Sequence, residues 1–346
     1  MSNWLPAILA FSLPLLATAL GIRLVLPWLR ARALDRPNER SLHSVPTPRG
    51  AGIVVMAVLV AALWTIELGT GAPLARMAVL TAAIAGLAAV SWLDDRKGAD
   101  VRLRLGVQLL AAIAGLGVLG IGALAERIGL PLWLVGTVLA LAWMWFINLY
   151  NFMDGIDGIT GVETASIGIG LVALAVLTLG AVAGQALTGL ALAGAAIGFL
   201  VWNWRPARVF LGDVGSVPLG YIVGAFLIQS AVAGHWAPAL ILPLYYLADA
   251  TFVLVARALS GQKPWQAHKT HFYQRAHQGG LSHAQVSLAI GALNIVLIAL
   301  AAAAGLGWTW IALAGASLAV ALLLAVFAAR GASGRGAEAP AKSRAG

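Results

Sequence analysis

The chain has 346 residues, of which 61% are hydrophobic and only 10% are charged, and its mean hydropathy is +0.90. This composition excludes a soluble globular domain. The formal net charge of +9 does not indicate a nucleic-acid-binding surface, because the basic residues are spread among short loops. The absence of cysteine excludes disulfides and thiolate metal sites.

Long apolar segments follow one another along the whole chain. A membrane core about 30 Å thick requires roughly 20 apolar residues per helical span, and the sequence predicts about eleven such helices on this basis. They fall near residues 4–26, 51–68, 74–93, 105–124, 131–148, 160–182, 185–204, 216–233, 236–257, 284–306 and 308–329. The runs are too long and unbroken for an outer-membrane barrel, so we expect an all-α, polytopic integral membrane protein.

The ends of the chain differ from its middle. The first apolar segment lacks a basic leader and a cleavage site, so we expect it to be retained as a helix. We expect residues 1–330 to form a single transmembrane domain. Residues 331–346 are rich in Gly, Ala, Ser and basic side chains, which predicts a disordered tail.

The positions of the charges predict the orientation. Most of the 22 Lys and Arg residues fall in loops on one side of the predicted spans, and the positive-inside rule makes that side cytoplasmic. We therefore expect a multi-pass protein of the inner (cytoplasmic) membrane with a periplasmic N-terminus and a cytoplasmic C-terminus. Most carboxylates lie in the same loops, so we also expect the functional site at the cytoplasmic face.

Two adjacent acids, Asp94 and Asp95, follow the third apolar segment directly. Like charges at a membrane boundary raise each other's energy unless a cation joins them. A Mg²⁺–phosphate site would supply that cation. The alternative is a solvated loop start in which Arg96 and Lys97 are the partners.

The fifth apolar segment ends in a polar stripe. Asn148, Asn151, Asp154 and Asp157 recur every three residues and share one face wherever the backbone is helical. Carboxylate and amide oxygens are the ligands that Mg²⁺ prefers. A helix-cap or packing role is the alternative.

A lone acid, Asp213, lies between two glycines where the eighth apolar segment begins. Backbone N–H groups at such a helix start bind anions, and Asp213 would add a metal ligand. A simple helix N-cap is the alternative.

Basic groups in two other loops are candidates for substrate binding. His268, His271 and Arg275 follow the ninth segment and favour phosphate binding. Zinc is not expected there, because no Cys or acidic third ligand is near; an ordinary amphipathic loop is the alternative. The first loop, which ends in Arg49, mixes basic residues with prolines, and by charge alone it is an orientation signal.

Taken in order, these loops resemble one family. The segments DRPNERSLHSVPTPRGAGI, SWLDDRKG, NLYNFMDGIDGI, FLGDVGSVPLG and AHKTHFYQRA are similar to those of the polyprenyl-phosphate N-acetylhexosamine-1-phosphate transferase superfamily, glycosyltransferase family 4. The family includes MraY of peptidoglycan synthesis and the enzymes that initiate O-antigen and teichoic-acid assembly. The likeness covers about residues 35–290.

The resemblance implies a role for each candidate residue. It implies ten or eleven spans, a UDP-N-acetylhexosamine donor, a polyprenyl-phosphate acceptor and Mg²⁺, for which Mn²⁺ can substitute. The metal ligands would be Asp213 and Asn151, and the catalytic acids Asp94, Asp95, Asp154 and Asp157. The substrate-binding residues would be Asn148, Arg104, His268, His271, Arg275 and Arg49.

The last segment departs from the family pattern. Only His271 of the usual histidine cluster is present, with Tyr273 and Gln274 at the later positions. This form is most similar to the subgroup that starts O-antigen repeats with UDP-N-acetylfucosamine-like donors, and it argues against MraY. The sugar itself and the oligomeric state stay open, and a homodimer is allowed.

The expected reaction is attack of the lipid phosphate on the β-phosphorus of the UDP-sugar, which releases UMP. Two alternatives remain at this point. One is a peptidoglycan-type phospho-MurNAc-pentapeptide transferase. The other is a secondary transporter, for which Asp249, deep in a predicted span, would be a proton-linked site; otherwise Asp249 is a structural acid bonded across helices.

Overall fold

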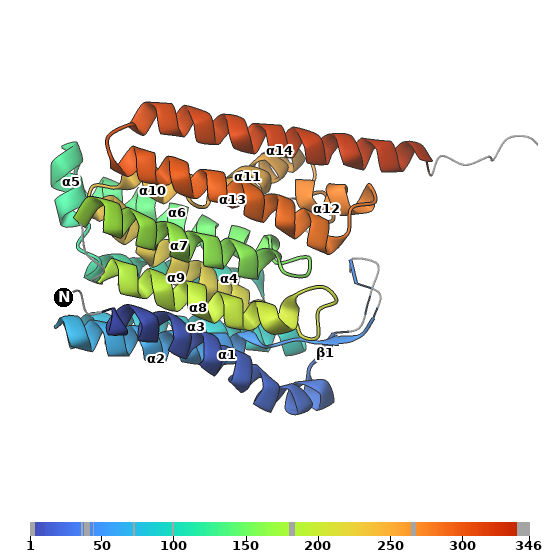
Figure 1. The fold of residues 1–346 in the computed structure, drawn as a ribbon, viewed down its shortest axis with the longest axis horizontal. Coiled ribbons are helices and arrows are strands. Elements are labelled where there is room, and N and C mark those ends of the chain that lie inside the picture. Colours follow the sequence, from blue (N-terminus) through green and yellow to red (C-terminus); the bar gives the residue numbers. More distant parts are fainter. Residues whose placement is uncertain are drawn as a thin grey trace, which may run out of the picture.

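The computed structural model describes residues 4–337 except for 36, 38–41, 44, 72, 99, 180–183 and 264–267. Within these residues the protein is a bundle of long helices that lie side by side (Figure 1). The helices of the first half are α1 (Leu5–Arg32), α2 (Gly52–Thr70), α3 (Leu74–Lys97), α4 (Val101–Val118), α5 (Gly122–Ile128), α6 (Leu132–Phe152) and α7 (Ile159–Leu179). Those of the second half are α8 (Gln185–Asn203), α9 (Asp213–Val232), α10 (Trp236–Ile241), α11 (Leu244–Leu259), α12 (Phe272–Gln278), α13 (His283–Gly305) and α14 (Thr309–Ala337).

The predicted all-α, polytopic membrane architecture is confirmed. Among the described residues, ten helices are long and apolar enough to cross a membrane. The predicted span over residues 236–257 is instead divided into α10 and α11. The division falls at Pro243, because proline lacks the N–H that a continuous helix needs and clashes with the preceding turn. Together α10 and α11 run from the α5 end of the bundle toward its α12 end (Figure 1).

The most buried helix, α9, forms the centre of the bundle. It packs against α2, α3, α6 and α10, and every residue from Val214 to Ile228 is buried. Around it, α8 packs between α1 and α7, and α13 packs between α7 and α14.

Small residues bring these helices close together, as expected in a membrane. A Cβ atom added at Gly194 in α8 would lie 2.2 Å from the carbonyl oxygen of Phe11 in α1, and one added at Gly168 in α7 would lie 2.6 Å from that of Gly189 in α8. The backbones therefore touch where a larger side chain would separate the helices.

The polar loops gather at one end of the bundle, where β1 and α12 lie, and α5 lies at the other end (Figure 1). The strands β1 (Leu34–Asp35) and β2 (Thr47–Pro48) form a short antiparallel pair at this end. Arg49, the next residue, makes a parallel bridge with Phe210 just before α9.

The C-terminal helix is longer than the sequence analysis predicted. α14 continues past Gly331 to Ala337, so this part of the predicted disordered tail is helical. The contact of α12 with Gly331 gives a reason, because a Cβ atom there would lie 2.8 Å from Cβ of Arg275. Residues 338–346 of the predicted tail lie outside the described residues.

Candidate active site

The adjacent acids at the end of α3 each have an arginine partner. Asp94 Oδ2 lies 2.5 Å from Arg104 Nη1, one turn into α4. Asp95 Oδ1 lies 3.3 Å from Arg49 Nη1, and Arg49 Nη2 also donates to the Asp95 carbonyl oxygen at 2.6 Å. Distant parts of the chain thus meet at this pair.

Main-chain hydrogen bonds hold Arg49 in place. The N–H groups of Gly50 and Ala51 both donate to the Phe210 carbonyl oxygen at 3.1 Å, and that of Gly52 donates to Leu211 at 3.0 Å. A Cβ atom at Gly52 would lie 2.2 Å from Cα of Gly215, so only glycine permits this contact. The first loop therefore does more than set orientation, because it is joined to the start of α9.

Asp213 is the first residue of α9 and lies beside Asn151 at the end of α6. The two side chains are hydrogen bonded to each other, and Ser216 Oγ donates to Asn151 Oδ1 at 2.6 Å. Asp213 is close enough to Asp94, Arg49 and Arg104 to interact with each of them electrostatically. Three segments that are far apart in the sequence converge on this carboxylate.

Asp154 lies in the loop between α6 and α7. Thr160 Oγ1 donates to its Oδ1 at 2.6 Å. Burial raises the pKa of Asp154 from 3.8 to about 7; the Thr160 hydrogen bond opposes this rise and the charge of Asp213 adds to it. Asp154 is therefore a carboxyl group that can gain or lose a proton near neutral pH.

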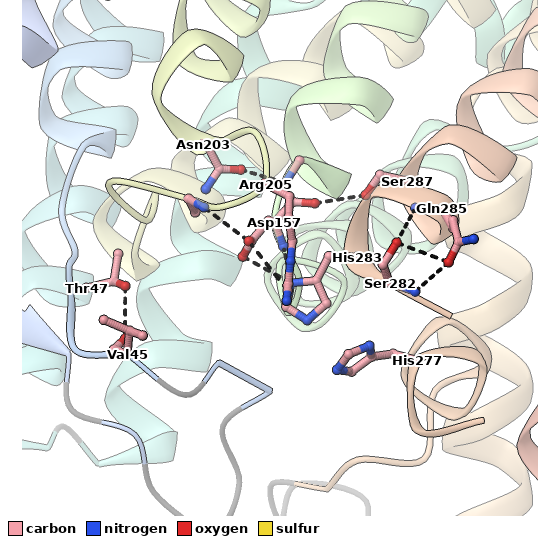
Figure 2. Close-up of polar contacts among 12 residues, drawn as sticks. Val45, Thr47, Asp157, Asn203, Arg205, His277, Ser282, His283, Gln285 and Ser287 are labelled. Atoms are coloured by element: carbon pink, nitrogen blue, oxygen red, sulfur yellow. Dashed lines mark hydrogen bonds and ion pairs between the residues drawn. The ribbon is translucent and has the colours of Figure 1, made fainter. Parts of the chain in front are cut away.

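Asp157 lies at the centre of a polar cluster at the start of α7 and α13 (Figure 2). Its Oδ1 is 3.1 Å from His283 Nδ1, and its Oδ2 accepts the Ala207 N–H at 3.1 Å and lies 3.8 Å from Arg205. Ser287 Oγ donates to its carbonyl oxygen at 2.9 Å. Burial raises the pKa of Asp157, but His283, the Ala207 N–H and Arg205 outweigh it, so the pKa is lowered from 3.8.

A mostly apolar cavity of about 250 Å³, here called the apolar cavity, opens between α3, α4, α6 and α9. Leu87, Val90, Leu105, Met144 and Trp145 line it, and its polar end is formed by Asp94, Arg104, Gln108, Asn148, Asn151 and Asp213. Asn148 donates to Gln108 at 2.6 Å. Such a cavity suits a ligand with an apolar body and a charged head.

A second cavity of about 230 Å³, here called the polar cavity, lies beneath the first loop. Its polar lining residues are Asp35, His43, Arg49, Asn151, Asp154, Asp157, Asn203, Asp213 and Gln274. Asn151 and Asp213 line both cavities. The two cavities therefore meet at these two side chains.

The basic residues after α11 flank Gln274, which lines the polar cavity. His268, His271 and Arg275 are described by the structure but are not among the residues that line either cavity. Burial, together with His271 and Arg257, lowers the pKa of His268 from 6.5 to about 4, so this imidazole is neutral near pH 7. A role for these three residues in phosphate binding remains a prediction.

Asp249 is fully buried and has an evident set of partners. It accepts hydrogen bonds from Tyr245 in its own helix and from the first residues of α12. Of the two roles that the sequence left open, the structure shows the acid bonded across helices.

Gln108 and Ser216 belong to the site, although no motif in the sequence indicated them. Each lies one helical turn after a residue that the sequence did indicate, Arg104 and Asp213 respectively, and residues spaced in this way share a helix face. Helical spacing would have found both.

The oxygen atoms present suit Mg²⁺. No group of three or more His, Asp or Glu side chains that could hold a metal occurs in the described part of the chain. Mg²⁺ needs fewer, because it typically binds one or two carboxylates and completes its octahedron with water and substrate phosphates. Asp213 and the Asn151 amide, with the Asp94 charge nearby, meet this requirement.

A bundle of helices long and apolar enough to cross a membrane, with paired acids and arginines at one end, defines a multi-pass membrane protein with a polar site, and comparison with known proteins identifies the family. Residues 77–231, which include the site residues from Asp94 to Asp213, match Glycosyl transferase family 4. The chain belongs to this family and is an enzyme, which rules out the secondary transporter.

Several curated proteins are similar over most of their length. A probable undecaprenyl-phosphate N-acetylglucosaminyl 1-phosphate transferase of Bacillus subtilis is 26% identical over 78% of this chain and 76% of its own. An undecaprenyl-phosphate alpha-N-acetylglucosaminyl 1-phosphate transferase of Yersinia pestis is 28% identical over 84% and 80%. A phospho-N-acetylmuramoyl-pentapeptide-transferase of Streptococcus suis is 28% identical over 64% and 69%.

Proposed function

We propose that the protein transfers N-acetylhexosamine 1-phosphate from a UDP-sugar to polyprenyl phosphate, which releases UMP and starts a lipid-linked glycan of the cell envelope such as O-antigen. The names of the similar proteins from Bacillus subtilis and Yersinia pestis support the acceptor and the transferred group. The observation that carries the proposal is that Asn151 and Asp213 line both the apolar and the polar cavity. An apolar lipid and a polar nucleotide sugar would meet at these two side chains.

Each cavity suits one substrate. The apolar cavity would take the part of the lipid next to its phosphate, with Arg104 beside that phosphate. The polar cavity would take the nucleotide sugar, with Arg49 beside the diphosphate. Charge-assisted hydrogen bonds from guanidinium groups orient phosphates strongly.

The reaction joins the two phosphates. An oxygen of the lipid phosphate attacks the β-phosphorus of the UDP-sugar, and the bond from that phosphorus to the bridging oxygen of the α-phosphate breaks, so that UMP leaves with this oxygen. The protein contributes positioning and charge stabilisation. Asp94 orients Arg104, and an anionic phosphate nucleophile needs no strong base.

Asp213 and Asn151 would hold Mg²⁺, with Mn²⁺ able to substitute. When bound, the ion neutralises charge on the diphosphate. We further propose that the site lies at the cytoplasmic face of the inner membrane, because most basic loop residues lie at this end. A water-soluble UDP-sugar would reach it from the cytoplasm.

The test is an assay of UMP release by purified protein in detergent. We expect release to require polyprenyl phosphate and Mg²⁺, and to stop when EDTA is added and resume when Mg²⁺ or Mn²⁺ is restored. The donor panel would include UDP-N-acetylglucosamine, UDP-N-acetylfucosamine and UDP-MurNAc-pentapeptide. No release with any donor, or release without the lipid, would overturn the proposal.

A further inference from the structure

Asp157 lines the polar cavity, and other segments of the chain hold both its main chain and its side chain. Ser287 in α13 donates to its carbonyl oxygen, and the Ala207 N–H donates to its Oδ2. Arg205 lies 3.8 Å from the same oxygen, but its side chain is 42% exposed, and an exposed ion pair contributes little. The other carboxylate oxygen, Oδ1, faces His283.

His283 is the first residue of α13 and lies against Asp157 (Figure 2). Its Nδ1 is 3.1 Å from Asp157 Oδ1 and 3.3 Å from the main-chain nitrogen of the same residue. Among the described residues, it is the only buried side chain that bonds to this carboxylate. One imidazole thus contacts both the main chain and the side chain of a residue that lines the cavity.

Packing alone does not account for a histidine at this position. Its Nε2 is buried and has no hydrogen-bonding partner in the part of the chain that the structure describes, and a buried polar atom without a partner costs free energy. An apolar side chain of similar size would fill the space without this cost. The hydrogen-bonding contacts of the ring are those that Nδ1 makes with Asp157.

Charge divides the polar cavity into two parts. Arg49 lines it and suits the diphosphate of the nucleotide sugar. The pKa of Asp157 is lowered from 3.8, so its carboxylate is ionised near pH 7. An ionised carboxylate repels phosphates and accepts hydrogen bonds from hydroxyl and N–H groups. Asp157 therefore suits the uncharged part of the nucleotide sugar.

We infer that His283 is a positioning residue, which fixes the direction of the Asp157 carboxylate so that it accepts hydrogen bonds from the uncharged part of the bound nucleotide sugar. The inference rests on the proposed function, because that reaction supplies the nucleotide sugar. If His283 only joined α13 to the start of α7, its loss would lower stability without weakening the binding of this substrate. The two roles therefore make different predictions.

The first measurement is the Kd of UDP-N-acetylglucosamine, by calorimetry on the purified full-length protein with Mg²⁺ and without polyprenyl phosphate. We expect His283→Leu to raise this Kd about 10- to 100-fold, the effect of losing a hydrogen bond to a charged group. His283→Asn can place its amide where Nδ1 lies, and we expect its Kd to stay within about threefold of the wild type. Should His283→Leu not fold, His283→Gln takes its place, because the longer side chain carries the amide past that position.

The matched control is Ser287→Ala, which removes the other hydrogen bond between α13 and Asp157 and leaves the carboxylate contacts in place. We expect a lower unfolding midpoint, because a buried carbonyl oxygen loses its partner, and a Kd within about threefold of the wild type. Three results would overturn the inference: a wild-type Kd in His283→Leu or its glutamine substitute, an equal rise in Ser287→Ala, or no recovery in His283→Asn.

Steady-state kinetics provide a second readout. A contact with a part of the donor that does not react strengthens the ground state and the transition state equally. We therefore expect His283→Leu to raise the KM for the UDP-sugar about 10- to 100-fold and to change kcat by less than about threefold. In an Asp157→Asn background we expect no further rise in KM. A fall in kcat at unchanged KM would contradict the inference.

The two measurements also separate this inference from the proposed function. A wild-type protein that binds UDP-N-acetylglucosamine but releases no UMP with any donor would contradict the proposed function. The comparison of Kd values among the His283 variants and Ser287→Ala would still decide the inference.

Discussion

Asp213 is the residue on which the proposed site depends most, since it lines both cavities and lies beside Asn151, the other proposed Mg²⁺ ligand. We predict that Asp213→Asn lowers kcat about 100-fold or more while expression and the helical bundle persist, because a neutral amide lacks the negative charge that strengthens Mg²⁺ binding and balances the nearby arginines. The measurement is UMP release at saturating substrates.

Asp100→Asn is the matched control for this prediction. Asp100 caps α4 by accepting the Arg102 N–H, and asparagine caps helices as well as aspartate. We expect less than about a twofold change in kcat. Wild-type turnover in Asp213→Asn would show that the metal assignment is wrong.

The cluster around Asp157 predicts a pH dependence of stability. The pKa of Asp157 is lowered in the folded protein, so its contribution to stability is present above its unfolded value of 3.8 and is lost as the pH falls through the folded value. We predict that the wild type is more thermally stable than Asp157→Asn at pH 7 and that the difference shrinks toward pH 3.

The measurement is the midpoint temperature of unfolding in detergent for both proteins across this pH range. Asp154, whose raised pKa acts in the opposite direction, is present in both proteins, so its effect cancels in the difference. A difference that stays constant down to pH 3 would contradict the assigned cause.

The spacing of residues in the sequence predicted which side chains lie on the same face of a helix, but it did not predict their bonding partners. Asn151 and Asp157 fall on a polar stripe and line one cavity, yet the contact of Asp157 with His283 joins residues far apart in the chain. Asp249 looked like an isolated intramembrane acid. Two of its donors are backbone N–H groups of α12. Every residue except proline has such a group, so these bonds cannot be predicted from residue types.

At the scale of elements, the contact between the start of α2 and the start of α9 determines where Arg49 and Asp213 lie. We predict that Gly52→Ala lowers both thermal stability and kcat, because its Cβ atom would lie 2.2 Å from Cα of Gly215 and 2.4 Å from its nitrogen. Backbone atoms cannot move aside as a flexible side chain does. Unfolding midpoints and UMP release measure the two effects.

Gly69→Ala is the matched control, since it lies in the same helix and a Cβ atom there meets nothing within 4 Å. We expect stability equal to or greater than that of the wild type, because alanine favours a helix over glycine by about 1 kcal/mol. If Gly52→Ala and Gly69→Ala have the same unfolding midpoint and the same kcat, the close contact at Gly52 does not determine stability or activity.

The apolar runs predicted most of the helices, and the exceptions have local causes. The hydropathy of residues 236–257 suggests one span, but Pro243 separates α10 from α11. The polar composition after Gly331 suggested disorder, but packing against α12 accompanies the helix in that region. Tertiary contacts of this kind override composition.

At the scale of the whole molecule, β1 and α12 lie at the end of the bundle opposite α5 (Figure 1). The polar cavity is lined by Asp35 of β1 and Gln274 of α12, and it shares Asn151 and Asp213 with the apolar cavity. We predict that the end with β1 and α12 is cytoplasmic. Because the chain has no cysteine, a single introduced cysteine reports its own side of the membrane. In intact cells a membrane-impermeant maleimide should label Ala123→Cys in α5 and should not label Ser333→Cys in α14.

Permeabilised cells are the control, since both cysteines should then react. Labelling of Ser333→Cys in intact cells, with Ala123→Cys protected, would reverse the predicted orientation. It would also place the site on the side where no cytoplasmic nucleotide sugar reaches it.

The central claim is that a sugar is transferred together with its phosphate, and the β-phosphate of the donor tests it most directly. Purified protein would be given polyprenyl phosphate and UDP-N-acetylhexosamine carrying ³²P only in the β-position. We expect the label to appear in the lipid and the released nucleotide to be unlabelled UMP. Label that stays in UDP, with an unlabelled lipid product, would contradict it.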